Sequence, residues 1–65
     1  MTYYVKIEKN AEACVVETID WEENLALVKV DSESHKVSLY NLVMQTSLLE
    51  KKPFDEVSKA LTDDF

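Results

Sequence analysis

The sequence predicts an α+β fold in which a curved four-stranded antiparallel β-meander is followed by one or two short C-terminal helices. Two patterns lead to this prediction. Up to about residue 40, apolar and polar side chains alternate in short runs that end at polar turn residues. After that point the apolar residues recur at a spacing nearer to that of a helix. Because the 65 residues contain no linker, repeat or low-complexity stretch, we expect a single small domain, 1–65.

The first two strands are predicted at residues 2–8 and 13–20. In the first, Tyr3, Val5 and Ile7 share one face while charged side chains occupy the other, the alternation of a half-buried strand. The second is rich in β-branched residues, which suit a pleated surface. A turn-tolerant asparagine lies between them, so we expect a hairpin.

Two further strands are predicted at residues 25–31 and 35–40. Asn24 precedes the first of them, and asparagine is, after glycine, the residue that most readily takes a positive φ at a hairpin corner. Residues 31–34, Asp-Ser-Glu-Ser, predict a four-residue turn, because such side chains bond back to their own backbone. Each strand is therefore expected to pair antiparallel with the strand before it.

A first helix is predicted at residues 42–51. Its expected buried side has helical spacing and consists of Leu42, Val43, Thr46 and Leu49. Ser38 or Asn41 could cap its N-terminus. The segment Lys36–Met44 also fits a longer strand, so helix and strand remain alternatives for residues 40–50.

A second helix is predicted at residues 53–62. Pro53 suits the first helical turn, and the acidic residues that follow complement the positive end of the helix dipole. The expected buried stripe of this helix is Phe54, Val57 and Leu61.

Residues 13–42 resemble the middle of a Tudor domain or another SH3-like small barrel. The shared pattern is an acidic Ile19-Asp20 corner, a strand Ala26-x-Val28-x-Val30 and a closing segment Val37-x-Leu39-x-x-Leu42. The resemblance implies antiparallel strands with the curvature of an SH3-like partial barrel. Tudor domains read methylated side chains with an aromatic cage, but the corresponding turn, Asp31-Ser32-Glu33-Ser34, lacks the aromatic residue and the glycine of the family. The resemblance therefore implies a fold and no ligand.

Two missing residue types argue against whole classes of function. The chain has no glycine, so it lacks the loops that bring the backbone close to the phosphates of nucleotides. All seven basic residues are lysine, and only arginine offers a planar fork for a phosphate or a guanine edge. Together with a net charge of −6, these absences argue against direct binding of nucleic acid.

The sequence predicts neither an enzyme nor a metal or cofactor site. Cys14 is the only cysteine and His35 the only histidine, and nothing in the sequence supplies an oxyanion hole or a cleft for a catalytic pair. The adjacent carboxylates of Glu22 and Glu23 are expected to point apart in a turn. His35 follows two carboxylates at alternate positions, an arrangement more typical of surface hydrogen bonding than of a metal site.

The hydropathy of the chain predicts no contact with a membrane. The longest unbroken apolar runs, residues 13–16 and 25–28, have four residues each, too few for a signal peptide or a membrane span. We therefore expect a cytoplasmic location, with which a single unpaired cysteine agrees.

Negative charge is concentrated in residues 17–33. This segment carries six acidic residues and one lysine, so it holds −5 of the net charge of −6. Its carboxylates and its tryptophan are the predicted partner-binding residues: Glu17, Asp20, Trp21, Glu22, Glu23, Asp31 and Glu33.

Such an acidic surface, projecting from one end of the sheet, could imitate the phosphate row of a nucleic acid. A solvated hairpin tip that keeps the domain soluble is the simpler alternative. Trp21 either folds back over the end of the sheet or lies exposed as the anchor of an interface.

A second apolar side of the first helix is formed by Tyr40, Met44 and Leu48, at positions i, i+4 and i+8. This side could pack against the second helix of the same chain. It could instead form a homodimer contact, and it is the predicted oligomer face.

These features predict a small acidic protein-binding regulator or inhibitor of phage or mobile-element type. It would act by occupancy, as a DNA mimic on the basic surface of a larger, nucleic-acid-handling protein. One alternative is a self-associating assembly module that uses Tyr40, Met44 and Leu48. Another is an SH3-like module that binds a short peptide along an exposed strand, Tyr3–Glu8 or His35–Leu39.

Overall fold

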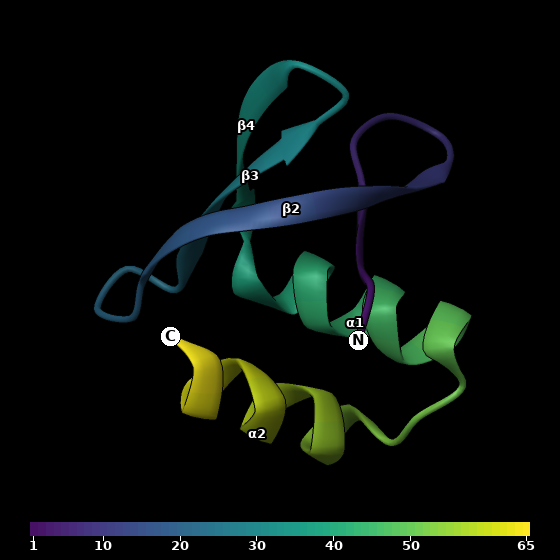
Figure 1. Cartoon of the computed structure of the whole chain (residues 1–65), viewed down its shortest axis with the longest axis vertical. Helices are drawn as coiled ribbons and strands as arrows, with labels where there is room; N and C mark the ends of the chain where they lie inside the picture. Colours follow the sequence, from purple (N-terminus) through teal and green to yellow (C-terminus); the bar gives the residue numbers. More distant parts are fainter.

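The computed structural model describes residues 1–65 and contains four strands followed by two helices (Figure 1). The elements are β1 Tyr3–Lys6, β2 Ala11–Asp20, β3 Leu25–Val30, β4 Glu33–Ser38, α1 Leu39–Glu50 and α2 Phe54–Asp64. Neighbouring strands pair antiparallel in the order β1-β2-β3-β4. The predicted α+β meander is confirmed. The sheet does not close into a barrel, because β1 and β4 are its two unpaired edges.

Two turns of the meander depend on residues with a positive φ. Asn24 has a φ of 57° at the end of the β2–β3 turn, as the sequence predicts. Asp31 also has a φ of 57°, which lets Asp31 and Ser32 alone reverse the chain between β3 and β4. The prediction of a four-residue turn at residues 31–34 was wrong, and β4 begins at Glu33 for this reason.

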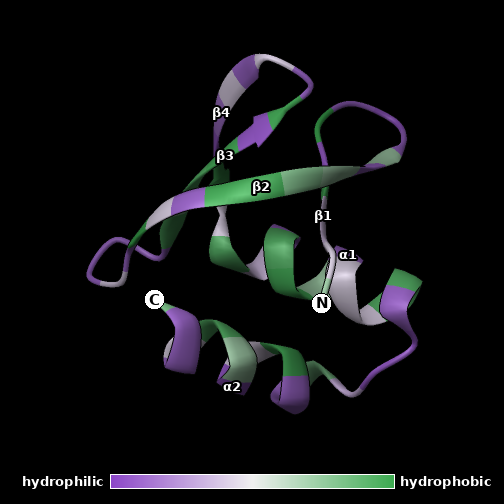
Figure 2. Ribbon diagram, in the orientation of Figure 1, coloured by the Kyte–Doolittle hydropathy of each residue, from purple (hydrophilic) through white to green (hydrophobic).

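Strand β2 is long and is shared by two partners. Its first part pairs with β1 and its second part with β3, and the register shifts between Val16 and Thr18. The extra residue, Glu17, forms a bulge that reverses the alternation of inward and outward side chains. Cys14, Val16 and Ile19 consequently all face the helices. Figure 2 shows that hydrophobic residues fill the middle of β2 and that the turns are hydrophilic.

Residues 40–50 are helical, which decides between the two alternatives left by the sequence. Ser38 caps α1, because its Oγ accepts the backbone N–H of Asn41 at 3.1 Å. The helix ends at Lys51, which takes a left-handed conformation with a φ of 57°. Leu49, predicted on the buried side, is exposed and stands in the last turn of the helix, beyond the buried residues Leu42, Val43 and Thr46.

Helix α2 begins at Phe54, directly after Pro53. Val57 and Leu61 are buried as predicted. Phe54 is exposed, contrary to the prediction, because its ring lies beside that of Tyr40 on the surface, with the ring centroids 5.9 Å apart. Neither helix is both long enough and apolar enough to cross a membrane.

Helix α1 lies between the sheet and α2 (Figure 1). The buried apolar residues come from both layers and are mostly small: Val5, Val16, Ala26, Val28, Val30, Leu42, Val43, Val57 and Leu61. Helix α1 therefore packs against the sheet on one face and against α2 along one flank.

Side chains of α1 also bond to the outer edge of β1. Asn41 accepts the N–H of Lys6 at 2.9 Å and donates to its carbonyl at 2.8 Å. Thr46 accepts the N–H of Tyr4 at 2.9 Å and donates to its carbonyl at 3.3 Å. Thr46 is fully buried, and without these bonds its hydroxyl would have no hydrogen-bond partner in the core.

Candidate partner-binding site

The β2–β3 turn, residues 20–24, is an ordered tip that is fastened to α1. Asp20 Oδ1 accepts the backbone N–H of Glu23 at 3.1 Å. The carbonyl of Asn24 accepts the backbone N–H of Leu39 at 2.9 Å, so the first residue of α1 is bonded to the end of the turn. These bonds hold Trp21 and its acidic neighbours in a defined position relative to the helices.

An open apolar pocket of about 440 Å³ lies between this tip, α1 and α2. Its lining residues are Trp21, Asn24, Leu39, Tyr40, Val43, Phe54, Ser58 and Leu61. Trp21 is 43% exposed, so it neither folds fully back over the sheet nor projects freely: it forms one wall of the pocket. Tyr40 and Phe54, whose rings lie beside each other, also line it.

The residues that flank Trp21 on the tip are acidic, although none of them lines the pocket. Asp20, Glu22 and Glu23 are exposed and form no ion pair with any lysine. On α2, Asp55 follows Phe54 and is likewise unpaired. The pocket thus combines an apolar floor with acidic neighbours whose charges are not neutralised within the chain.

The other acidic residues of the segment 17–33 lie elsewhere. Consecutive turns of a meander alternate between the two ends of the sheet, so the β3–β4 turn lies at the end opposite the tip (Figure 1). Asp31 and Glu33 line an open hollow there together with Lys9 and His35, and His35 Nε2 is 3.8 Å from a Glu33 carboxylate oxygen. The expectation of one continuous acidic end is not met.

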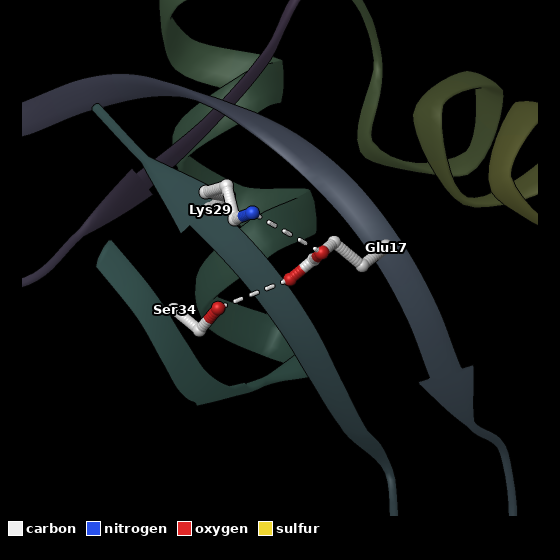
Figure 3. Close-up of polar contacts among 3 residues, drawn as sticks. All are labelled: Glu17, Lys29 and Ser34. Carbon is white, nitrogen blue, oxygen red and sulfur yellow. Dashed lines mark hydrogen bonds and ion pairs between the residues drawn. The ribbon is translucent and has the colours of Figure 1, made fainter. Parts of the chain in front are cut away.

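Glu17 is not part of the tip: Figure 3 shows its carboxylate beside Lys29 and Ser34. One carboxylate oxygen is 3.9 Å from Nζ of Lys29, and the other accepts the Ser34 hydroxyl at 3.2 Å. The β-bulge places Glu17 over these neighbouring strands. Because its charge is compensated by Lys29, Glu17 contributes little to the field at the tip.

The three residues of the predicted oligomer face have separate environments. Tyr40 lines the pocket, whereas Met44 and Leu48 do not. Leu48 is exposed near the end of α1, and Met44 is half-buried between the other two. The structure therefore joins Tyr40 to Trp21, two residues that the sequence analysis placed in different surfaces.

The one thiol of the chain is not activated. Cys14 is half-buried on β2, and burial raises its pKa to about 11, so the thiol is protonated at neutral pH. Cys14 and His35 line different hollows. No group of three or more histidine, cysteine, aspartate or glutamate side chains is arranged to hold a metal ion.

Phe54 is the pocket residue that the sequence analysis assigned to the wrong environment. Its position at the start of an amphipathic helix is typical of a buried residue, and only the contact with Tyr40 identifies its role. Ser58 and Leu61 reach the same pocket from one and two turns further along α2. No local signal in the sequence links α2 to the tip.

Comparisons with known proteins found no matching family model, no matching curated protein and no matching solved structure.

Proposed function

We propose that this chain is a small acidic protein-binding regulator that acts by occupancy. In this proposal the pocket receives an apolar side chain of the partner, and the carboxylates of the tip attract basic residues around that side chain. The observation that carries the proposal is the meeting of Trp21, Tyr40 and Phe54, from three different elements, in one open pocket beside unpaired carboxylates.

Each part of the site has a defined physical contribution. Tryptophan and tyrosine are over-represented among the residues that dominate binding energy, because they bury a large apolar area and keep one polar group free for a hydrogen bond. Exposed charges add little affinity by themselves, but they accelerate association with a surface of opposite sign. Affinity is therefore expected to depend on the pocket, and the rate of association on the tip.

The partner that this chemistry fits is a protein with a lysine- and arginine-rich groove. Nucleic-acid-handling proteins present such grooves, and the net charge of −6 favours them while it disfavours nucleic acid itself. Occupation of the groove would exclude nucleic acid, which makes inhibition by a DNA mimic of phage or mobile-element type the form of regulation that we favour.

A binding experiment can use Trp21 as its probe, because it is the only tryptophan and it lines the pocket. The ligand is a synthetic peptide with a central phenylalanine flanked by lysines. Matched peptides carry serine at the centre, or glutamates in place of the lysines. We expect a blue shift of the fluorescence with the first peptide alone, and a dissociation constant that rises with salt.

A charge-reversal pair separates the tip from the net charge of the chain. Glu22→Lys with Glu23→Lys should weaken peptide binding by about tenfold or more. Asp31→Lys with Glu33→Lys changes the net charge equally at the opposite end and should have a much smaller effect. Equal losses from the two double variants would mean that only net charge matters. Unchanged binding by Tyr40→Ser would show that the pocket is not the site.

A further inference from the structure

The outward face of α1 belongs to the longest uncharged segment of the chain, residues 37–49. No charged residue occurs between Lys36 and Glu50, although 31% of the chain is charged. Tyr40 and Leu48 on this face are 63% and 61% exposed, and Met44 lies between them. The opposite face of the helix is already buried against the sheet. Phe54 of α2 meets this second apolar face at Tyr40, and the face remains exposed at its other end, Leu48.

We infer that this strip is the contact between two copies of the chain, which pack α1 against α1 in antiparallel orientation about a twofold axis at Met44. Tyr40 and Leu48 are each four residues from Met44, so they lie on one ridge of the helix. An axis at Met44 brings Tyr40 of each copy to Leu48 of the other. The ridge is thereby self-complementary, as an interface around a twofold axis requires.

The distribution of charge favours a second copy as the occupant. Each chain carries a net charge of −6, so contacts through most of its surface would bring carboxylates together. The strip avoids this repulsion. At its C-terminal end, Lys51 is exposed and unpaired, whereas the acidic tip is bonded to its N-terminal end through Asn24 and Leu39. Antiparallel packing brings Lys51 of each copy towards the tip of the other.

A small core provides the thermodynamic reason for association. Domains of this size bury a limited apolar area and commonly gain stability from disulfides, metals or oligomerisation. The only cysteine here is unpaired within the chain. Because the strip is one helix wide, we expect a weak dimer, with a dissociation constant on the order of micromolar.

Disulfide cross-linking tests the position of the axis. Residue 44 of one copy should lie beside residue 44 of the other, so Met44→Cys in a Cys14→Ala background should form a covalent dimer on mild oxidation. Val15→Cys in the same background is the matched control, because Val15 is 68% exposed on the open face of the sheet. Equal cross-linking of the two variants would overturn the proposal.

Sedimentation without cross-linking tests whether the dimer exists. Wild type should shift from monomer to dimer over about a hundredfold range of concentration around the dissociation constant. Leu48→Glu should weaken the dimer by about tenfold or more, while Val15→Glu, which adds the same charge elsewhere, should have a smaller effect. Circular dichroism checks that both variants are folded. A wild-type chain that stays monomeric throughout would overturn the inference.

Tyr40 belongs to both the dimer contact and the pocket, so Leu48 is the residue that separates the two. Met44 and Leu48 do not line the pocket, so Leu48→Glu should retain the fluorescence response of Trp21 to the lysine-flanked peptide. If Leu48→Glu instead abolishes that response at concentrations where the wild type is monomeric, the strip belongs to the peptide site and is not a contact between copies.

Discussion

The two edges of the sheet differ in whether their outward backbone groups have hydrogen-bond partners. On β1, the outward backbone groups of Tyr4 and Lys6 are bonded to Thr46 and Asn41 of α1. On β4, alternate residues point their backbone groups away from β3, and those of Ser34 and Lys36 make no bond to another part of the chain. These outward residues are Ser34, Lys36 and Ser38, because the bond from Leu39 N–H to Asn24 sets the alternation.

This difference shows that a helix can close a sheet edge as a neighbouring strand would. Two polar side chains of α1 each supply one donor and one acceptor, so β1 offers nothing to a further strand. The edge of β4 is protected only by charge and polarity, with Lys36 at its middle. Of the two segments considered for peptide binding from the sequence, Tyr3–Glu8 and His35–Leu39, only the second retains unpaired outward backbone groups, at Lys36, and its last residue, Leu39, belongs to α1.

The largest expected effect comes from placing proline on β4. His35 directs its N–H to β3, so His35→Pro removes a bond of the ladder and should lower the free energy of unfolding by about 3 kcal/mol or more. Lys36→Pro removes an outward N–H and should cost no more than about 1 kcal/mol. Urea unfolding of both variants gives the comparison. Equal losses would mean that the β4 edge is not free.

The next largest effect is expected at the closed edge, from Thr46→Val. This change keeps the shape of a fully buried side chain but leaves the N–H and carbonyl of Tyr4 without partners. We expect a loss of about 2–3 kcal/mol in the free energy of unfolding. Thr46→Ser, which retains the hydroxyl, should lose less. If Thr46→Val is as stable as wild type, the bonds to Tyr4 do not fasten the edge.

Asn41→Ala should have a smaller effect at the same edge. The bonds between Asn41 and Lys6 are exposed, so water can replace them and the expected loss is about 1 kcal/mol. Hydrogen exchange at the amide of Lys6 should accelerate in this variant. Gln45→Ala is the matched control, since Gln45 lies on the same helix and its side chain makes no hydrogen bond within the chain. Similar exchange in both variants would contradict the assignment.

Raising the pH well above neutrality should destabilise the β1 edge before the β4 edge, whereas pH changes near neutrality should leave both unchanged. Burial raises the pKa of Cys14 to about 11, and burial together with Asp64 raises the pKa of Tyr3; the two residues are cross-strand neighbours on β2 and β1. Raised values mean that the neutral forms stabilise the fold, so stability is full below about pH 9 and falls as the pH approaches about 11.

Thiolate absorbance and urea unfolding along this pH range provide the measurements. Cys14→Ala should delay the onset of the loss until the ionisation of Tyr3. Hydrogen exchange should accelerate first in β1, ahead of β4. Exchange that accelerates first in β4 would show that alkaline loosening does not begin at the β1 edge.

Features with a local cause were predictable from the sequence. The alternation of Tyr3, Val5 and Ile7, the left-handed Asn24 and the Ser38 cap each depend on a few neighbouring residues, and the structure contains all three. The turn at Asp31 was predicted with four residues and has two. Asp31 takes a left-handed conformation, which reverses the chain in fewer residues, and the sequence does not show in advance that an aspartate will do so. The acidic tip was identified as a candidate site without the pocket beside it.

The sequence by itself determined the order of the elements, the antiparallel pairing of adjacent strands and the net charge, because these follow from local periodicity, turn chemistry and composition. Only the tertiary structure decided that Glu17 lies apart from the acidic tip. It also decided that Asn41 and Thr46 bond to the outer edge of β1, and that Trp21 lines one pocket with Tyr40 and Phe54. Those outcomes depend on a bulge and on the packing of helices against strands distant in the chain. A periodic pattern tells which face of an element is apolar, but not which distant residue will cover it.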